Sequence, residues 1–348
     1  MKKRMESRLY AEDIASVRAT FDFSALKGRS ILITGAAGLI GSAVVDLLAE
    51  TETTIYAAGR NRERMRRRFD GYSNVRYVLY DAASMQTPDL PSVDYIIHGA
   101  SNADPKAIME HPVSTMLANI IGTSHLLEYA KNSAVKRSLL ISSSEIYGKK
   151  ECTDAFLEKE YGFVDLLNAR SCYPMGKRAA ETLCASYAAE FGIDYVIARP
   201  GHIYGPTARA DDSRISSDFT YCAARGEALV LKSGGMQRRS YCYCVDCASA
   251  ILYILLYGDS GEAYNISNKS SIITIREMSE ILAQAAGVLL LAGEPSPLEK
   301  QAFNPMMNSS LNSEKLESLG WHGLFDAQTG LRHTVEILRD LVRATAEE

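Results

Sequence analysis

The sequence lacks a hydrophobic run long enough to cross a membrane, which takes roughly 20 apolar residues. The apolar stretch Ala248–Tyr257 is too short and is typical of a buried helix. At the N-terminus Lys2, Lys3 and Arg4 are followed by further charged residues, so the apolar core of a signal peptide is missing. We therefore expect a cytoplasmic protein without a membrane partner.

An excess of basic charge is missing as well. The formal net charge is -4 and the isoelectric point is near 6.0. Such a chain has no overall positive field that would attract a phosphate backbone. We expect no nucleic-acid partner.

Cysteines are few and show no pairing pattern. There are seven, scattered except for Cys242, Cys244 and Cys247. A disulfide framework or a structural zinc site needs regularly spaced pairs, and no second Cys or His pair stands at finger-like spacing. The sequence favours reduced thiols and no metal site.

Short apolar segments alternating with helical ones are present instead. The apolar segments are Ile31–Thr34, Thr54–Ala58, Val75–Tyr80, Tyr95–His98, Ser138–Ser142 and Tyr195–Ala198. Near-continuous apolar strands separated by helices are typical of a parallel sheet covered on both faces. This pattern predicts an α/β protein with a doubly wound Rossmann sheet and a smaller, interleaved C-terminal α+β substrate lobe.

The same pattern predicts the domain boundaries. Residues 1–27 form an N-terminal helical extension, with a helix and linker expected over 7–27. Residues 28–200, together with about 240–257, form the dinucleotide-binding domain. Residues 201–239 and 258–348 form the substrate lobe.

Three glycines follow the first predicted strand. In Gly35-Ala36-Ala37-Gly38-Leu39-Ile40-Gly41, the first glycine permits a tight turn, the second a close approach of a pyrophosphate, and the third close packing of helix and strand. The N-terminus of the following helix, at Leu39 and Ile40, would face the phosphates. The position of this loop between strand and helix predicts a dinucleotide site.

The end of the second predicted strand bears on the choice of cofactor. An NAD enzyme usually has an acidic residue there for the ribose, but this chain has Gly59-Arg60-Asn61. A small residue followed by Arg60 leaves room and charge for a 2′-phosphate, so the sequence favours NADP over NAD. The remaining arginines up to Arg68 are interpreted mostly as a solvated helix face. Asp81, after the third strand, is expected near the adenine.

A catalytic set is predicted from Ser143, Tyr173 and Lys177. Tyr173 and Lys177 lie four residues apart on a predicted helix and can face the same site. An ammonium beside a phenol favours the phenolate, so we expect Lys177 to lower the pKa of Tyr173 and make it a general base. Ser143 ends a strand and can hydrogen-bond the reacting oxygen.

These motifs resemble the extended short-chain dehydrogenase/reductases, the NAD-dependent epimerase/dehydratases, over about residues 28–325. Within that family the nearest pattern is that of UDP-glucuronate decarboxylases, carried by the helix from Arg170 to Glu181. The resemblance implies a nucleotide-diphosphate sugar as substrate, oxidised at C4 by bound NAD(P), then decarboxylated. It implies catalytic roles for Tyr173, Lys177, Ser143 and Glu145, with Glu145 in a second proton transfer.

The resemblance also implies further contacts and an assembly. The other expected cofactor residues are Ala100, Ser101 and Pro200, and the expected substrate residues are Ser144, His202, Arg209, Arg214 and Arg239. A homodimer is expected through helices around Ile108–Lys131 and Lys177–Phe191, by analogy with relatives.

Three departures leave the reaction open. Gly59-Arg60 replaces the acid, His202 replaces an asparagine, and Asn304-Pro305-Met306-Met307 replaces a late arginine motif. A 4-epimerase, a 4,6-dehydratase, an NADPH-dependent keto-sugar reductase and a dinucleotide-binding sensor or scaffold remain alternatives. Ser144-Glu145 has only the second carboxylate of the usual dehydratase pair, which disfavours the dehydratase.

Overall fold

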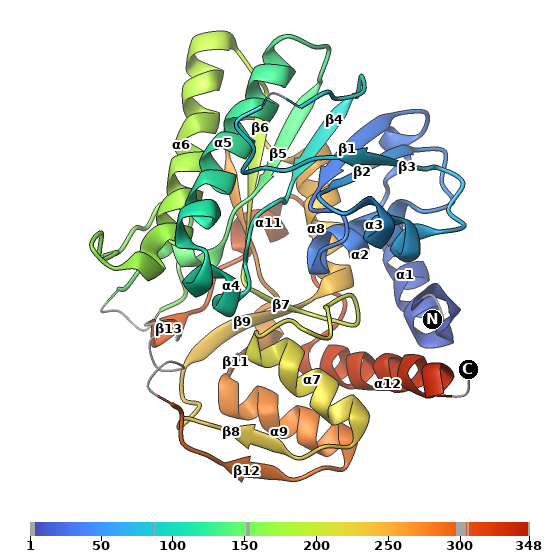
Figure 1. Ribbon diagram of the computed structural model, residues 1–348, viewed down its shortest axis with the longest axis vertical. Helices are drawn as coiled ribbons and strands as arrows, with labels where there is room; N and C mark the ends of the chain where they lie inside the picture. The colour runs from blue at the N-terminus through green and yellow to red at the C-terminus, as the bar shows by residue number, and fades with distance from the viewer. Residues whose placement is uncertain (1–3, 87, 151–153, 297–303, 305, 347–348) are drawn as a thin grey trace.

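Seven parallel strands form the central sheet of the molecule (Figure 1). The computed structural model describes residues 4–86, 88–150, 154–296, 304 and 306–346. The strands lie in the order β10-β6-β5-β4-β1-β2-β3. Their bounds are β1 Ser30–Thr34, β2 Thr54–Gly59, β3 Val75–Leu79, β4 Tyr95–His98, β5 Arg137–Ile141, β6 Tyr195–Pro200 and β10 Ala263–Ile266. This order is that of a doubly wound fold and places its topological switch point between β1 and β4.

Helices cover both faces of this sheet. On one side lie α5 (Pro112–Lys131) and α6 (Cys172–Phe191), and on the other α2 (Leu39–Leu48) and α8 (Cys244–Tyr257) (Figure 1). Alternate residues of β1 show the division, because Ile31 packs in the same core cluster as Val44 of α2, whereas Leu32 packs with Leu126 of α5. Burial on both faces explains why the strands are almost continuously apolar.

The second lobe contains two small sheets and the helices α7 (Ile215–Arg225), α9 (Ile275–Ala286) and α12 (Ala327–Ala346). One sheet is built around β9 (Arg238–Tyr243), which pairs with β11 (Ile272–Thr274), β13 (Asn308–Ser309) and β7 (His202–Tyr204). The other pairs β8 (Leu229–Leu231) with β12 (Leu290–Ala292). The shorter elements are α3 Arg62–Phe69, α4 Pro105–Glu110, α11 Glu314–Ser318 and the 3-10 turns η1 Arg4–Glu6, η2 Ser24–Leu26, η3 Ser144–Tyr147, η4 Ala169–Ser171 and η5 Lys269–Ser271.

The predicted fold class is confirmed, and two of the expected boundaries need correction. β10 lies within the range 258–348 assigned to the lobe, yet it pairs with β6 and extends the central sheet. Within 240–257, α8 covers the central sheet, whereas β9 belongs to the sheet of the lobe. The chain therefore crosses between the two parts more often than its sequence pattern indicated.

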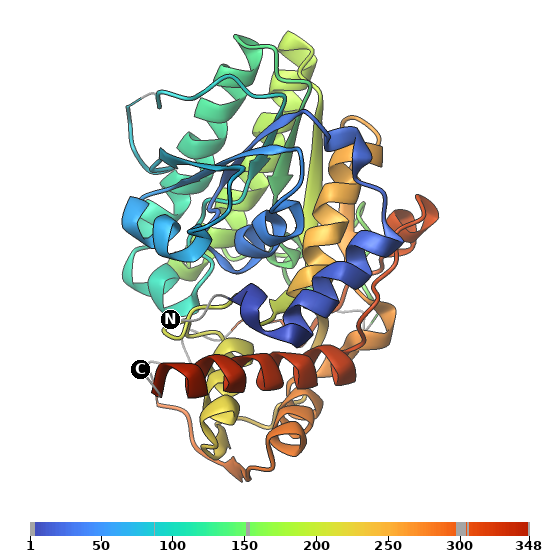
Figure 2. The same ribbon diagram turned by 90° about the vertical axis from the view of Figure 1, so that its right-hand side faces the viewer.

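The N-terminal extension is helical, as expected. Its helix α1 (Arg8–Thr20) lies between α8 and α12 (Figure 2), and Tyr10, Ile14 and Val17 are buried there. No helix in the described ranges is long and apolar enough to span a membrane.

Candidate active site

The glycine loop between β1 and α2 is shaped by close backbone contacts. Gly35 has a φ of +70°, and a Cβ there would lie 2.7 Å from the carbonyl oxygen of Gly99. A Cβ on Gly41 would lie 2.5 Å from the carbonyl oxygen of Gly35. Gly38 is the N-cap of α2, which begins at Leu39 and leaves its first N–H groups without partners inside the helix. This arrangement fits the pyrophosphate of a dinucleotide.

The loop after β4 is held against the end of β1. The Thr34 hydroxyl lies 2.7 Å from Nδ1 of His98 and accepts hydrogen bonds from the backbone N–H groups of Gly99 and Ala100, both at 3.2 Å. Ala100 and Ser101 are half-buried. The two expected cofactor residues therefore lie on the loop beside the switch point, where dinucleotides bind in this fold.

The arginines after β2 do not all face solvent. Arg60 is exposed, and Asn61 caps α3 by accepting from the N–H of Arg64. Arg64 is half-buried and donates to the carbonyl oxygen of Ala37 in the glycine loop at 3.3 Å. Its interpretation as part of a solvated face is therefore wrong. Asp81 is exposed, and its side chain accepts from a neighbouring backbone N–H.

Ser143, Tyr173 and Lys177 come together from β5 and α6. Tyr173 and Lys177 lie one turn apart on α6, and both are buried. Lys177 donates from Nζ to the carbonyl oxygen of Ile141 at 2.7 Å. Ser143 caps η3, where its hydroxyl accepts from the N–H of Glu145 at 3.1 Å. The end of β5 and the first two turns of α6 thus position the predicted catalytic set.

The pKa values of this set differ from the expectation. Burial raises the pKa of Tyr173 to about 12 and the charge of Glu145 adds to this, while a hydrogen bond with Ser143 and the charge of Arg214 act in the opposite direction. Burial also lowers the pKa of Lys177 to about 8. The expectation that Lys177 lowers the pKa of Tyr173 below its ordinary value is wrong for the protein alone, because desolvation of the phenolate outweighs the favourable charges.

Glu145 is held by an arginine that the sequence reasoning did not single out. Arg170 donates from Nη2 to Oε1 of Glu145 at 2.8 Å, and the side chains are 8% and 21% exposed. The Nε of Arg170 is buried and has no partner among the described atoms. Its signal in the sequence was its place three residues before Tyr173, one helical turn away. Ser144 is buried beside Glu145.

Arg239 and His202 lie near each other and have polar atoms that are not fully paired in the described part of the chain. Arg239 is buried and donates from Nη1 to the carbonyl oxygens of Arg238 and Met307, at 2.9 and 3.5 Å. Burial lowers its pKa. Burial, followed by the charges of Arg239 and Arg214, lowers the pKa of His202, and its Nδ1 has no partner among the described atoms. His202 is therefore neutral and available for a hydrogen bond.

Arg214 and Arg209 have different surroundings. Arg214 pairs with Asp212 at the start of α7, and its charge acts on Tyr173 and His202. Arg209 is exposed and pairs with Asp211. Burial lowers the pKa of Arg64, and the charge of Arg209 lowers it further. The substrate role expected for Arg209 remains a prediction.

An ion pair beneath the site links α6 to the end of β6. Glu181, one turn after Lys177, accepts from the Ser142 hydroxyl and from Nη2 of Arg199 at 2.6 Å. Arg199 precedes Pro200, which is buried at the end of β6. This pair braces the strand ends that present Ser143 and Pro200, and it was also missed from the sequence.

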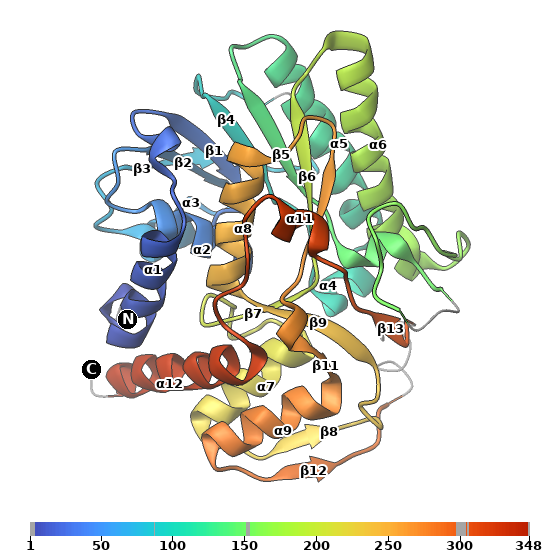
Figure 3. The same cartoon turned by 180° about the vertical axis from the view of Figure 1, so that it is seen from behind.

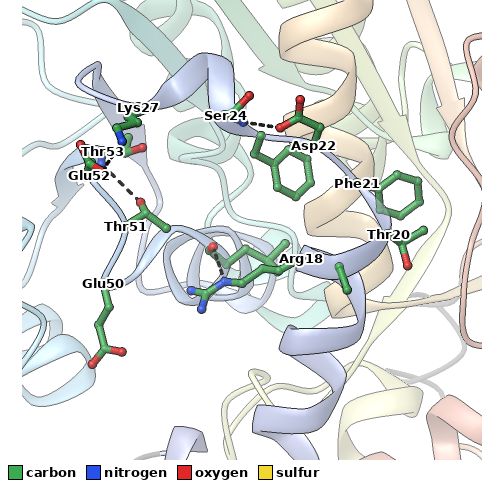
Figure 4. A pocket seen from close by; sticks show the side chains of 13 residues that line it. Arg18, Thr20, Phe21, Asp22, Ser24, Lys27, Glu50, Thr51, Glu52 and Thr53 are labelled. Atoms are coloured by element: carbon green, nitrogen blue, oxygen red, sulfur yellow. Dashed lines mark hydrogen bonds and ion pairs between the residues drawn. The ribbon is translucent and has the colours of Figure 1, made fainter.

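A separate hollow of about 600 Å³ opens between the end of α1 and the end of α2 (Figure 4). Arg18 projects from α1 and donates to the carbonyl oxygens of Asp46, Leu47 and Ala49, which end α2. None of the predicted site residues lines this hollow.

Comparisons with known proteins agree with the geometry. Residues 31–267 match the model of the NAD dependent epimerase/dehydratase family. UDP-glucuronic acid decarboxylase 3 of Arabidopsis thaliana is 34% identical over 310 residues, which cover 86% of each chain. The expected resemblance to UDP-glucuronate decarboxylases is confirmed.

Solved structures share the fold. UDP-glucose 4-epimerase from Thermotoga maritima, solved with UDP-glucose, superposes with a TM-score of 0.77 at 24% identity, covering 90% of this chain and 99% of that one. The dTDP-glucose 4,6-dehydratase DesIV from Streptomyces venezuelae, solved with NAD, has a TM-score of 0.75 at 24% identity, covering 89% and 97%. The family model and the identity to the decarboxylases show that the chain belongs to the NAD dependent epimerase/dehydratase family.

Proposed function

We propose that this protein oxidises a UDP-linked uronic acid at C4 and decarboxylates it. The observation that carries the proposal is Arg239, a buried guanidinium whose described hydrogen bonds go only to backbone carbonyls. An anionic group bound beside it would relieve an unfavourable buried charge. The sequence relationship to decarboxylases of UDP-glucuronic acid supports a carboxylate as that group.

In the first step, the phenolate form of Tyr173 removes the proton of the C4 hydroxyl, while Ser143 hydrogen-bonds the same oxygen. The charges of Arg214 and Arg170 favour this form against the effect of burial. A nicotinamide dinucleotide, which the glycine loop and the loop after β4 would hold, would supply the acceptor for the C4 hydride and the source of the hydride in the last step. The product of this step is a 4-keto sugar whose ketone is β to the carboxylate. Burial of Tyr173 and Lys177 keeps water away from the transferring proton.

In the second step, the bond between C5 and the carboxylate carbon breaks, and its electron pair moves into the C4 ketone as an enolate. Carbon dioxide leaves. Glu145 lies near Tyr173 and is fixed by Arg170, so its carboxylate is placed to orient a water molecule that gives its proton to C5, and solvent then replaces that proton. The hydride then returns to C4 and Tyr173 returns the proton, so no net oxidation remains.

The direct test is release of carbon dioxide from UDP-glucuronate. We expect release by the wild-type protein and a loss of about 10²- to 10⁴-fold in Tyr173→Phe, the usual range for a general base. Tyr257→Phe is the control, since Tyr257 is exposed on α8. Release that is unaffected by Tyr173→Phe would contradict the mechanism.

A keto-sugar reductase is the second candidate. Burial holds the pKa of Tyr173 at about 12, so the phenol starts protonated and can give its proton to a ketone oxygen. Arg60 and Arg64 follow β2, and Arg64 contacts the glycine loop, which supports a contact with a 2′-phosphate. NADPH is a common reductant. Oxidation of NADPH with a 4-keto nucleotide sugar, without carbon dioxide release from UDP-glucuronate, would establish this function instead.

We also propose NADP as the preferred cofactor, a cytoplasmic location and a homodimer. The exposed Arg60 after Gly59 supports the cofactor choice. Free thiols at the described cysteines suit a reducing compartment. The helices α5 and α6 pack against each other on one flank, seen in Figures 1 and 3, and exposed apolar side chains of α5 support a second copy there.

A further inference from the structure

The segment between β7 and α7, residues 205–214, is attached to three parts of the dinucleotide domain. Near its start, the Thr207 hydroxyl donates to the carbonyl oxygen of Leu39 at 2.7 Å. Arg68 of α3 donates to the carbonyl oxygen of Thr207 at 3.2 Å. Near its end, the backbone N–H and the hydroxyl of Ser213 both donate to Oδ2 of Asp104, at 2.6 and 2.8 Å.

These attachments lie on opposite sides of the switch point. Leu39 is the first residue of α2 and follows β1, whereas Asp104 caps α4 and follows β4. Strands β1 and β4 are neighbours in the sheet. Dinucleotides in this fold bind outside the carboxyl ends of the strands at that point. The segment therefore spans the edge of the sheet where the cofactor is expected.

The segment has two arginines, one on the side of the glycine loop and one on the side of Tyr173. Arg209 stands two residues after Thr207, which Arg68 of α3 contacts, and the same helix carries Arg64, which contacts the glycine loop. Arg214 acts on Tyr173 at the reaction centre. A further contact comes from the N-terminal extension, where Arg4 donates to the carbonyl oxygens of Pro206 and Ala208.

We propose that residues 205–214 form a strap that retains the bound dinucleotide, with Asp104 and Ser213 as its fastening and Arg209 as a contact for the 2′-phosphate. The strap rests on the proposed function, because an enzyme that returns the hydride to the same sugar has no need to exchange its cofactor. Arg209 would then select the cofactor rather than bind the diphosphate of the sugar.

The fastening is tested by the rate at which NADPH leaves. The purified protein is loaded with NADPH, excess NADP⁺ is added, and the loss of bound NADPH fluorescence is followed. We expect the release rate to rise about threefold to tenfold in Ser213→Ala and more than about tenfold in Asp104→Ala, since bonds to a carboxylate are among the stronger ones. Ser318→Ala, at an exposed serine on α11, should leave the rate unchanged.

The role of Arg209 is tested by comparing NADPH and NADH. Arg209→Gln should weaken NADPH binding by about tenfold and change NADH binding by less than about twofold, because only NADPH carries the 2′-phosphate. Arg225→Gln is the matched control, since Arg225 pairs with Glu227 two residues on, just as Arg209 pairs with Asp211.

Two results would overturn the strap. One is an unchanged release rate in both fastening variants, and the other is an equal effect of Arg209→Gln on the two cofactors. Wild-type protein that binds neither NADPH nor NADH would instead contradict the proposed function itself, so the two failures are distinguishable.

Discussion

Several side chains of the site carry positive charge away from solvent, with Arg170 and Arg239 buried and Arg214 half-buried. Arg170, Arg214 and Arg239 surround Tyr173 and His202, and Glu145 and Asp212 pair with the first two. Arg239 has no carboxylate partner in the described part of the chain. Because a buried, unpaired guanidinium is unfavourable, its removal need not destabilise the fold, whereas its pairing with a ligand gains free energy.

Replacement of Arg239 should therefore separate a carboxylate-bearing sugar from a neutral one. We expect Arg239→Gln to weaken UDP-glucuronate binding by about 10- to 100-fold, the range of a hydrogen bond to a charged group, and UDP-glucose binding by less than about threefold. Calorimetric titration of both sugars measures this, and Arg238→Gln at the exposed neighbouring residue is the control. Equal weakening of both sugars would assign Arg239 to the diphosphate.

Part of this site could be predicted because its spacing is local. Tyr173 and Lys177 are one helical turn apart whatever surrounds them, and Ser143 follows the end of β5 by two residues, where it caps η3. Arg170 of η4 and Glu145 of η3 are 25 residues apart in the sequence and meet only in the folded chain. A local sequence pattern therefore could not predict this pair. The raised pKa of Tyr173 likewise depends on burial in three dimensions.

At the scale of elements, α1 connects both halves of the molecule. Tyr10 donates to Asp46 on α2 at 2.9 Å. Asp13 accepts from the Tyr243 hydroxyl at 2.9 Å and lies 2.9 Å from Nδ1 of His333 on α12. The helical extension expected from the spacing of its apolar residues thus also carries a buried polar face, which ties the dinucleotide domain to the substrate lobe.

The strands of the central sheet were predictable where they were apolar throughout. β10 was not predicted, because it has only four residues and includes the polar residue Asn265. The buried side chain of Asn265 is hydrogen-bonded to Tyr147 and to backbone carbonyls. α12 was also missed, although Leu331, Val335 and Leu338 are buried at helical spacing. A pattern that counts apolar residues does not detect a strand or helix whose buried polar side chains are hydrogen-bonded to residues distant in the sequence.

The attachment of α8 to the segment before α12 predicts a pH-dependent stability. Asp246 of α8 is buried and accepts from the N–H groups of Leu324 and Phe325, both at 3.0 Å. Burial raises its pKa to about 7, despite these two hydrogen bonds. In the unfolded chain the pKa of an Asp is about 3.9, so between about pH 4 and 7 the folded state binds the extra proton. The free energy of unfolding contributed by Asp246 should fall as pH rises through this window.

Urea unfolding at pH 5, 6, 7 and 8 measures this contribution. Relative to Asp246→Asn, which stays neutral, the wild type should lose on the order of 1–4 kcal/mol between pH 5 and pH 8. Asp70→Asn, at an exposed position after α3, should run parallel to the wild type. Parallel curves for Asp246→Asn and the wild type would show that the carboxyl ionises alike in the folded and unfolded states.

At the scale of the whole molecule, the two lobes are interleaved because α8 and β10 return to the dinucleotide domain after β9 has left it. This arrangement leaves α5 and α6 on an outer flank that the substrate lobe does not cover (Figure 3). On α5, Val113 is 71% exposed, Met116 38% and Leu117 39%. Apolar side chains gathered on one flank are typical of a surface that another protein covers.

If a second copy covers that flank, one charged residue on α5 should separate the subunits. The wild type should sediment at about twice the chain mass of 38.2 kDa, and Leu117→Arg should sediment as a monomer, because an arginine buried without a partner in an apolar interface is costly. Leu289→Arg is the matched control, since Leu289 lies in the substrate lobe and is 69% exposed. It should keep the dimer. A wild type that sediments as a monomer at micromolar concentration would contradict the homodimer. A Leu117→Arg variant that remains dimeric would show that the interface lies on another surface.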